Sequence, residues 1–177
     1  MPMSSPASSR GNPSMGDVLR SVAVIGLIVL VVWAFGRIFF TNDVEKTIEP
    51  IDYAKVVEQA RPAASFELLA PTSLPKGWEA RSARFDPQAW HLGVFTDSGD
   101  YIGLEQIKTS VDRAVDRFAE GSKPAGTAEV DGRTWKVRSG PKGRWIYVRG
   151  DDGVTTLINS SASRKTVESY ISSLSTS

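Results

Sequence analysis

The sequence has no cysteine and only one histidine, His91, among its 177 residues. The absence of cysteine excludes disulfide bonds, thiolate nucleophiles and cysteine-ligated metals. Carboxylates are then the main side chains left to bind a metal ion, and their spacing in this chain does not match a calcium-binding loop. We therefore expect no metal and no other cofactor.

An excess of one charge sign is also lacking, because 21 lysines and arginines are balanced by 20 aspartates and glutamates. A net charge of +1 creates no overall field that would attract a nucleic acid or an acidic surface. Nucleic acid is therefore not an expected partner. Any charge-driven binding must come from a local group of residues.

One long apolar run indicates where the protein sits. Residues 21–40 contain a single charge, Arg37, and about 20 mostly apolar residues are enough for a helix to cross the hydrocarbon core. Aromatic side chains, which suit the headgroup boundary, gather at the C-terminal end of the run: Trp33, Phe35, Phe39 and Phe40. The run predicts one transmembrane helix over residues 18–40, so the lipid bilayer is an expected partner.

A cleaved signal peptide is the alternative, because Ala34-Phe35-Gly36 fits the small-x-small pattern before a cleavage point. The apolar run continues through Ile38 to Phe40 beyond that point, which favours an uncleaved anchor. Basic residues on the two sides do not decide the orientation, but a first apolar segment behind a short tail behaves as a signal anchor. We expect a single-pass protein of the cell membrane with its N-terminus in the cytoplasm and its C-terminal domain outside.

The segments around the apolar run differ in composition. Residues 1–17 are rich in serine and proline, which predicts a disordered cytoplasmic tail. Residues 41–50 are polar and of mixed charge, as in a short stalk. Residues 51–177 have the usual length of one domain and are expected to form it outside the cytoplasm.

Hydrophobic periodicity in residues 51–177 predicts an α+β domain. Apolar residues at helical spacing follow the capping residues Asp52 and Ser110 and recur from about Arg164, so two to three helices are expected. Alternating patterns bounded by turn residues predict about six strands: 79–85, 90–96, 101–108, 133–139, 144–149 and 154–159. Because most connections have hairpin length, the sheet is expected to be a largely antiparallel meander.

Six basic residues are the strongest candidate for a binding site. They lie in a stretch that contains no acidic residue and would suit an anionic lipid or a wall polymer: Arg133, Lys136, Arg138, Lys142, Arg144 and Arg149. The plainer interpretation is the solvated face of a hairpin, since polar and apolar residues alternate in 134–138 as in a half-exposed strand.

His91 is a weaker candidate. With Asp86 and Glu105 nearby in the fold it could act as a general base, and its neighbour Trp90 could belong to a stacking platform for sugars. No nucleophile stands in a recognisable elbow motif. A histidine with a satisfied side chain and a tryptophan in the core are the plainer interpretations, so no residue is assigned a catalytic role.

These observations leave three functions open. The first is a membrane-anchored, non-enzymatic module outside the cytoplasm that binds a partner, polymer or lipid of the envelope. The second is a hydrolase that uses His91 and a carboxylate. The third is a regulatory subunit of a larger membrane complex.

The sequence resembles a family of uncharacterised single-pass membrane proteins of actinobacteria, domain of unknown function 4245. The resemblance covers nearly the whole chain after the tail and rests on Arg20 with the anchor, Ile51-Asp52-Tyr53, Leu74-Pro75-x-Gly77-Trp78, Ser82-Ala83-Arg84, Trp90-His91-Leu92-Gly93, Tyr101-Ile102-Gly103-Leu104-Glu105-Gln106, Gly132-x-x-Trp135 and the C-terminal helix. It implies a domain outside the cytoplasm behind an N-terminal anchor. It implies no activity and no functional residues.

The predicted topology can be tested by labelling. A Ser98→Cys variant carries the only cysteine of the chain, and we expect a membrane-impermeant maleimide to label it in intact cells. Labelling only after lysis would reverse the topology. Mass measurement should find the chain uncleaved within the apolar run, and a new N-terminus at Arg37 would contradict the anchor.

Overall fold

The computed structural model describes residues 16, 19, 23–24, 26 and 49–176. The predicted tail at 1–17, transmembrane helix at 18–40 and stalk at 41–50 lie almost entirely outside these residues. Within the described part, no helix combines the length and the apolar character needed to span a membrane. The chain divides into two units between Thr47 and Ile48, and the fold below is that of residues 49–176.

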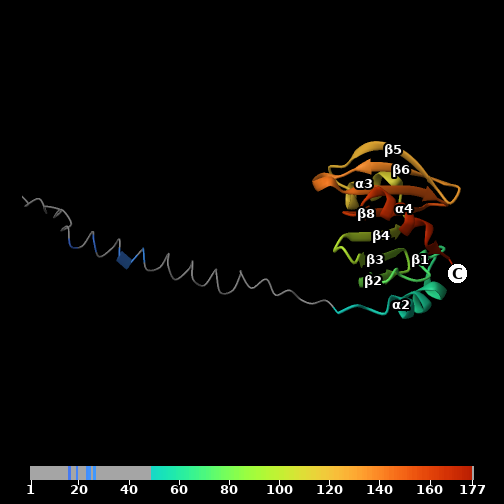
Figure 1. Ribbon diagram of the computed structural model, residues 1–177, viewed down its shortest axis with the longest axis horizontal. Helices are drawn as coiled ribbons and strands as arrows, with labels where there is room; N and C mark the ends of the chain where they lie inside the picture. Colours follow the sequence, from blue (N-terminus) through green and yellow to red (C-terminus); the bar gives the residue numbers. More distant parts are fainter. Residues whose placement is uncertain (1–15, 17–18, 20–22, 25, 27–48, 177) are drawn as a thin grey trace, which may run out of the picture. The chain divides into compact units, whose positions relative to one another are not determined.

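A seven-stranded sheet forms the centre of this domain, and every pair of neighbouring strands in it is antiparallel (Figure 1). Its strand order is β2-β3-β4-β8-β7-β6-β5. The strands are β2 (Glu79–Asp86), β3 (Ala89–Phe95), β4 (Tyr101–Ile107), β5 (Lys123–Val130), β6 (Arg133–Ser139), β7 (Trp145–Asp151) and β8 (Val154–Ser160). A separate short ladder pairs β1 (Ala70–Pro71) with β9 (Leu174–Ser175).

The chain builds the sheet as two meanders. Strands β2, β3 and β4 follow one another across the sheet, and α3 (Val111–Phe118) then leads to the far edge, where β5 begins. The second meander returns strand by strand until β8 pairs with β4. The predicted α+β class and antiparallel meander are therefore confirmed.

The six predicted strands are all present, but β5 was not predicted. Gly121 and Pro124 indicated only the end of the preceding helix. In the structure β5 is an edge strand, and its register with β6 shifts between Pro124 and Gly126. Proline is tolerated at sheet edges and bulges because no ladder hydrogen bond from its nitrogen is needed there. The correct count is seven strands in this sheet.

The helices begin where capping residues were predicted. α2 (Tyr53–Ala60) starts after Asp52, whose carboxylate accepts from the Lys55 backbone N–H at 3.4 Å. Ser110 accepts from the Arg113 N–H at 3.5 Å at the start of α3. The third helix, α4 (Arg164–Ser172), is capped in the same way by Ser163.

Two hydrophobic clusters lie on opposite faces of the sheet. The larger packs α2 and α4 on the face that carries Trp90, Leu92 and Tyr147, which we call the core face. The smaller packs α3 on Ile146, Val148 and Leu157, on what we call the α3 face. Both clusters lie wholly within residues 51–174, so a fragment of residues 49–177 contains every contact of the described core and is expected to fold alone.

Substitution of Tyr170 and of Tyr147 by phenylalanine should change the free energy of unfolding in opposite directions. The Tyr170 hydroxyl is buried with no hydrogen-bond partner among the described residues, while its ring stacks on Trp78. Tyr170→Phe removes this unsatisfied group and should raise the free energy of unfolding by about 1 kcal/mol. Tyr147→Phe should lower it by about 1 kcal/mol, because the Tyr147 hydroxyl donates to Glu168 at 2.7 Å. Urea unfolding of the fragment measures both free energies. A lower free energy of unfolding for Tyr170→Phe would contradict the assignment of the Tyr170 hydroxyl as a group without a hydrogen-bond partner.

The four tyrosines predict a loss of stability at high pH. Burial is the largest cause that raises the pKa of Tyr53, Tyr101, Tyr147 and Tyr170. Above about pH 10, the ordinary tyrosine pKa, the unfolded chain loses phenol protons that the folded chain retains. The contribution of these tyrosines to the free energy of unfolding should therefore be constant below about pH 10 and fall above it. Tyr101→Phe should make the fall shallower, and an unchanged slope would contradict the raised pKa of Tyr101.

Candidate functional site

The α3 face of β2, β3 and β4 carries a group of polar side chains beside the part that α3 covers. Strand alternation places His91 and Gly93 of β3 on this face, because Trp90, Leu92 and Val94 point into the core. In β4, Tyr101, Gly103 and Glu105 alternate in the same way with Ile102 and Leu104. The antiparallel register then sets His91 directly opposite Glu105.

Ser82, His91 and Glu105 form a hydrogen-bonded chain across three strands. The His91 Nδ1 atom lies 2.5 Å from Glu105 Oε1, and Nε2 lies 2.9 Å from Ser82 Oγ. The side chains of His91 and Glu105 are 19% and 17% exposed, so they are partly buried yet reachable by solvent. A hydroxyl, a histidine and a carboxylate connected in this order resemble a nucleophile, its general base and the group that orients the base.

Regular pairing from Ser82 to Asp86 places Ser82 on the same face as His91, and an irregularity in β2 lies directly before Ser82. The register between β2 and β3 shifts between Ala80 and Ser82, as at a β-bulge. Bulges redirect side chains and are frequent beside active sites. Ser82 pairs with Gly93, not with His91, so its hydrogen bond to the imidazole runs diagonally across the ladder.

Tyr101 and two glycines form the floor next to Ser82. An added Cβ at Gly103 would lie 2.7 Å from the Tyr101 hydroxyl, and one at Gly93 would lie 3.2 Å from it. The same added Cβ at Gly93 would also collide with Ser82 Oγ. Glycine at both positions therefore lets the phenol lie flat over the sheet, close to the serine.

The charges around Tyr101 come from two strands and a turn. Burial raises the pKa of Tyr101, and the Glu105 carboxylate raises it further, while Arg144 and Arg84 act in the opposite direction. Arg84 is paired opposite His91 in the ladder and is exposed. The polar group is thus bordered by one partly buried carboxylate and two cations.

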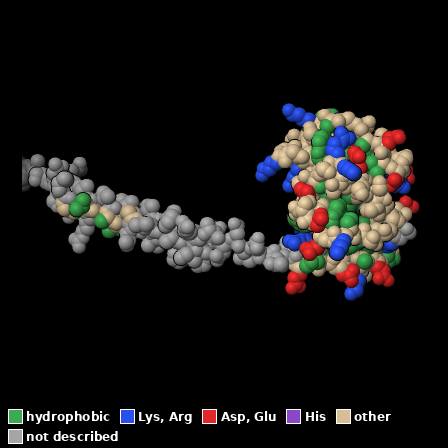
Figure 2. Space-filling view, in the orientation of Figure 1, with side chains coloured by type: hydrophobic (Ala, Val, Ile, Leu, Met, Phe, Trp, Pro, Cys, Tyr) green, Lys and Arg blue, Asp and Glu red, His purple; other side chains and the backbone are tan. Residues whose placement is uncertain are grey.

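The six predicted basic residues do not gather on one surface. Arg133 and Arg149 stand at core-face positions, where Arg149 lies over the Trp135 ring and pairs with Asp151. Lys136 and Arg138 stand at α3-face positions of β6, and Arg138 bonds the Ser122 side chain and carbonyl. In Figure 2 the basic and acidic side chains on the visible face are interspersed. Strand alternation divides the basic stretch, which the linear sequence presents as continuous.

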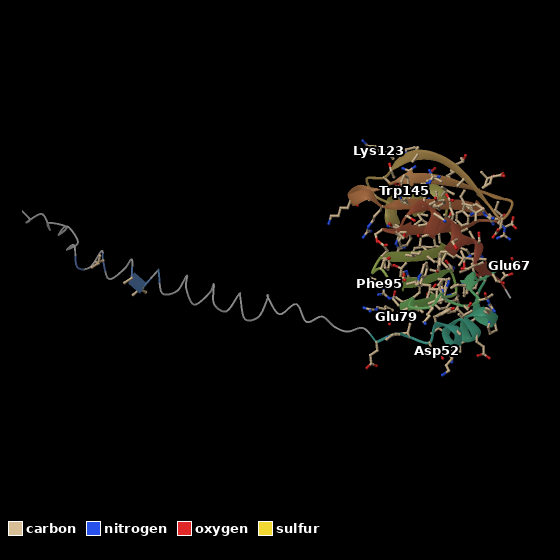
Figure 3. All side chains as sticks on the ribbon, in the orientation of Figure 1. Asp52, Glu67, Glu79, Phe95, Lys123 and Trp145 are labelled. Carbon is tan, nitrogen blue, oxygen red and sulfur yellow. The ribbon has the colours of Figure 1, made fainter. Side chains whose placement is uncertain are left out.

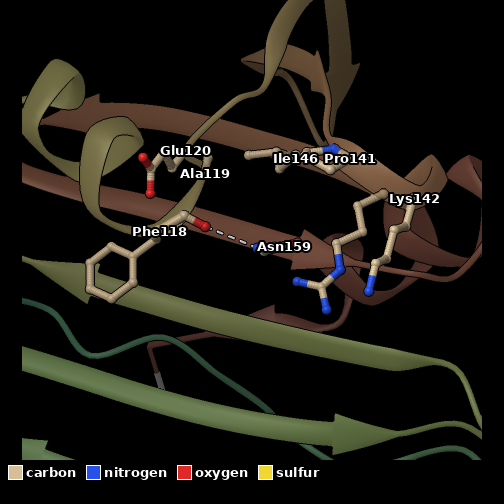
Figure 4. A pocket seen from close by; sticks show the side chains of 8 residues that line it. Phe118, Ala119, Glu120, Pro141, Lys142, Ile146 and Asn159 are labelled. Atoms are coloured by element: carbon tan, nitrogen blue, oxygen red, sulfur yellow. Dashed lines mark hydrogen bonds between the residues drawn. The ribbon is translucent and has the colours of Figure 1, made fainter.

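Lys142 and Arg144 do meet in a pocket. It encloses about 300 Å³ between the end of α3 and the turn η2 (Pro141–Gly143), and it is lined by Phe118, Ala119, Glu120, Pro141, Lys142, Arg144, Ile146 and Asn159 (Figure 4). Asn159 donates from Nδ2 to the Phe118 carbonyl at 2.9 Å. Its Oδ1 atom is buried and has no partner among the described residues.

Trp90, the remaining candidate from the sequence, belongs neither to the group of Ser82, His91 and Glu105 nor to the pocket. Its side chain is fully buried on the core face and donates from Nε1 to the Leu69 carbonyl at 3.0 Å. Gln106 holds the same segment, because its Oε1 accepts from the Leu69 N–H at 2.7 Å. Figure 3 labels Phe95 of β3 near Glu79, its partner in the β2–β3 ladder. Trp90 is therefore a packing residue.

Two residues of the polar group, Ser82 and Tyr101, were not identified from the sequence. Pairing the predicted strands around the turn at 86–89 sets Arg84 opposite His91 and Ser82 opposite Gly93, as the structure does, so strand alternation could have placed Ser82 on the His91 face, but no motif marks this serine. Among the described residues, no group of histidine, aspartate and glutamate side chains could hold a metal ion.

The comparisons with known proteins give a family without an assigned activity. No curated protein matches the chain. Residues 10–174, which include the whole of the sheet and both candidate sites, match the family described as "Protein of unknown function (DUF4245)". The chain therefore belongs to this family of proteins of unknown function.

Proposed function

We propose that this protein is a membrane-anchored module outside the cytoplasm that binds an anionic group of an envelope lipid or polymer. The observation that carries the proposal is the pocket where Lys142 and Arg144 lie together with the unpartnered Asn159 Oδ1 atom. Two cations on one pocket wall attract a phosphate or carboxylate, and arginine can bind either with two parallel hydrogen bonds.

The other lining groups narrow the chemistry of the ligand. Asn159 Oδ1 is a buried acceptor without a partner, which costs about 1–3 kcal/mol, and a ligand donor that reaches it would offset this cost. Glu120 at the same pocket also accepts hydrogen bonds. A ligand that combines an anionic group with hydroxyl or amide donors fits this set, as in a sugar phosphate or glycerol phosphate unit.

The geometry of the turn supports the placement of the two cations. Lys142 adopts a left-handed conformation with φ of 57°, and Gly143 follows with φ of 75°. The turn closes with the Gly140 N–H donating to the Arg144 carbonyl at 2.8 Å. Lys142 and Arg144 are both exposed, so the pocket is open to a ligand from solvent.

The predicted anchor at 18–40 supports this function because it would raise the effective concentration of the pocket near its ligands. A single pocket with exposed cations binds weakly, because solvent and salt screen its charges. Tethering the domain beside a membrane holds the pocket at a high effective concentration near envelope ligands, which raises occupancy without new contacts. The alternative of a regulatory subunit has less support, since no large hydrophobic side chain of residues 49–176 is exposed.

Charge removal in the pocket should reduce binding. We expect the fragment 49–177 to bind vesicles that contain phosphatidylglycerol, or a soluble polymer of glycerol phosphate if the ligand is a polymer, and to bind phosphatidylcholine vesicles at least tenfold more weakly. The Lys142→Gln/Arg144→Gln variant should lose most of this binding, and added salt should weaken the wild type.

A matched control variant has the same net charge as the pocket variant. The Lys76→Gln/Lys165→Gln variant removes two exposed cations that lie outside the pocket, and it should bind as the wild type does. Equal loss in both variants would mean that net charge alone drives binding. Binding that survives the pocket variant or ignores salt would overturn the proposed site.

A further inference from the structure

We propose that Ser82 is a catalytic nucleophile for carboxylic esters, with His91 as its general base and Glu105 as the positioning residue of that base. This activity goes beyond the proposed binding function and rests on different residues. Its basis is the hydrogen-bonded chain of Ser82 Oγ, His91 Nε2, His91 Nδ1 and Glu105 Oε1, with lengths of 2.9 and 2.5 Å.

The connectivity assigns the proton positions. A carboxylate only accepts hydrogen bonds, so Glu105 fixes the proton of the neutral imidazole on Nδ1. The lone pair of Nε2 then faces Ser82 and can accept the hydroxyl proton. This is the tautomer that a general base needs beside a serine nucleophile.

Gly93 and Tyr101 border the Ser82 hydroxyl. Gly93 lies beneath Ser82 Oγ, where any larger side chain would collide with it. The Tyr101 hydroxyl lies over the same glycine and can donate a hydrogen bond to a developing oxyanion. An ordinary tyrosine, with a pKa of about 10, is already protonated at neutral pH, and burial raises the pKa of Tyr101 further.

Arg84 extends the site toward anionic esters. It is paired with His91 in the ladder, follows Ser82 by two residues and is exposed at the edge strand of the sheet. Its guanidinium can receive a carboxylate or phosphate of the substrate next to the reacting carbonyl. The substrate class is therefore an ester that carries a negative charge.

The reaction balances in two steps. Ser82 Oγ forms a bond to the carbonyl carbon as its proton moves to His91 Nε2, and the ester C–O bond breaks while that proton passes to the departing alcohol. Water then attacks the acyl-Ser82 carbonyl, giving one proton to His91, which returns it to Ser82 Oγ as the acid is released. No metal, oxidant or other co-reactant takes part.

The hydrogen-bonded chain is not required to hold the strands together. The backbone ladder already pairs β2 with β3 over residues 79–86 and β3 with β4 along their whole length. Removal of the Ser82 hydroxyl should therefore leave the fold intact, which separates a chemical role from a structural one.

A fluorophosphonate probe tests the nucleophile directly in the full chain solubilised in detergent. Attack by Ser82 Oγ forms an oxygen–phosphorus bond, fluoride leaves, and the serine proton moves to His91. We expect intact mass and peptide mapping to find one phosphonate group, on Ser82, and p-nitrophenyl acetate to be turned over. Ser82→Ala should lose both signals, whereas Ser98→Ala, an exposed serine without a histidine partner, should keep them.

The roles of His91 and Glu105 are tested by the rate at which the probe labels Ser82. His91→Ala should slow labelling of Ser82 by about 10²–10⁴-fold, the usual contribution of a general base, and added imidazole should restore part of the rate. Glu105→Gln should slow labelling at neutral pH and change the pH profile of the rate. Circular dichroism of each variant checks folding. A folded wild type without an adduct on Ser82, or equal labelling rates in His91→Ala and wild type, would overturn the proposal.

Discussion

The register between β3 and β4 is the constraint on which the rest of the domain depends. It sets Leu92 beside Leu104 in the larger core and, by the same alternation, His91 beside Glu105 on the α3 face. A slip of one residue would bury the charged pair and expose the apolar one, so core and site cannot be changed independently. The energy of burying the core therefore also fixes the polar geometry.

The fold was largely readable from the sequence because its signals are local. Ser110 and Asp52 cap their helices as capping residues do elsewhere, and the glycine-containing turn after Phe95 joins two alternating strands. β5 could not be read in this way, since Pro124 and Gly126 are poor strand residues whose tolerance comes from the edge position and register shift. That information arises only once the second meander is assembled.

The candidate sites could be predicted only in part, because they depend on which face of the sheet each side chain takes and on where it points. The sequence predicted His91 and Glu105 as neighbours, and the structure places them 2.5 Å apart. It presented six basic residues as one stretch, but alternation sends Arg133 and Lys136 to opposite faces. Ser82 lies diagonally across from His91 in a regular part of the ladder, and no residue pattern in β2 specifies that its hydroxyl turns toward the imidazole.

The pocket and the hydrogen-bonded chain share one row of the sheet. Asn159 pairs with Gly103, Gly103 with Gly93, and Gly93 with Ser82. Three strand spacings, about 14 Å in total, therefore separate Ser82 from the pocket residue Asn159. Tyr101 lies between them above both glycines, under the influence of Arg144 from one side and Arg84 from the other. The two candidate sites therefore use different residues but lie on one face of the sheet, and the Tyr101 ring fills the interval between them.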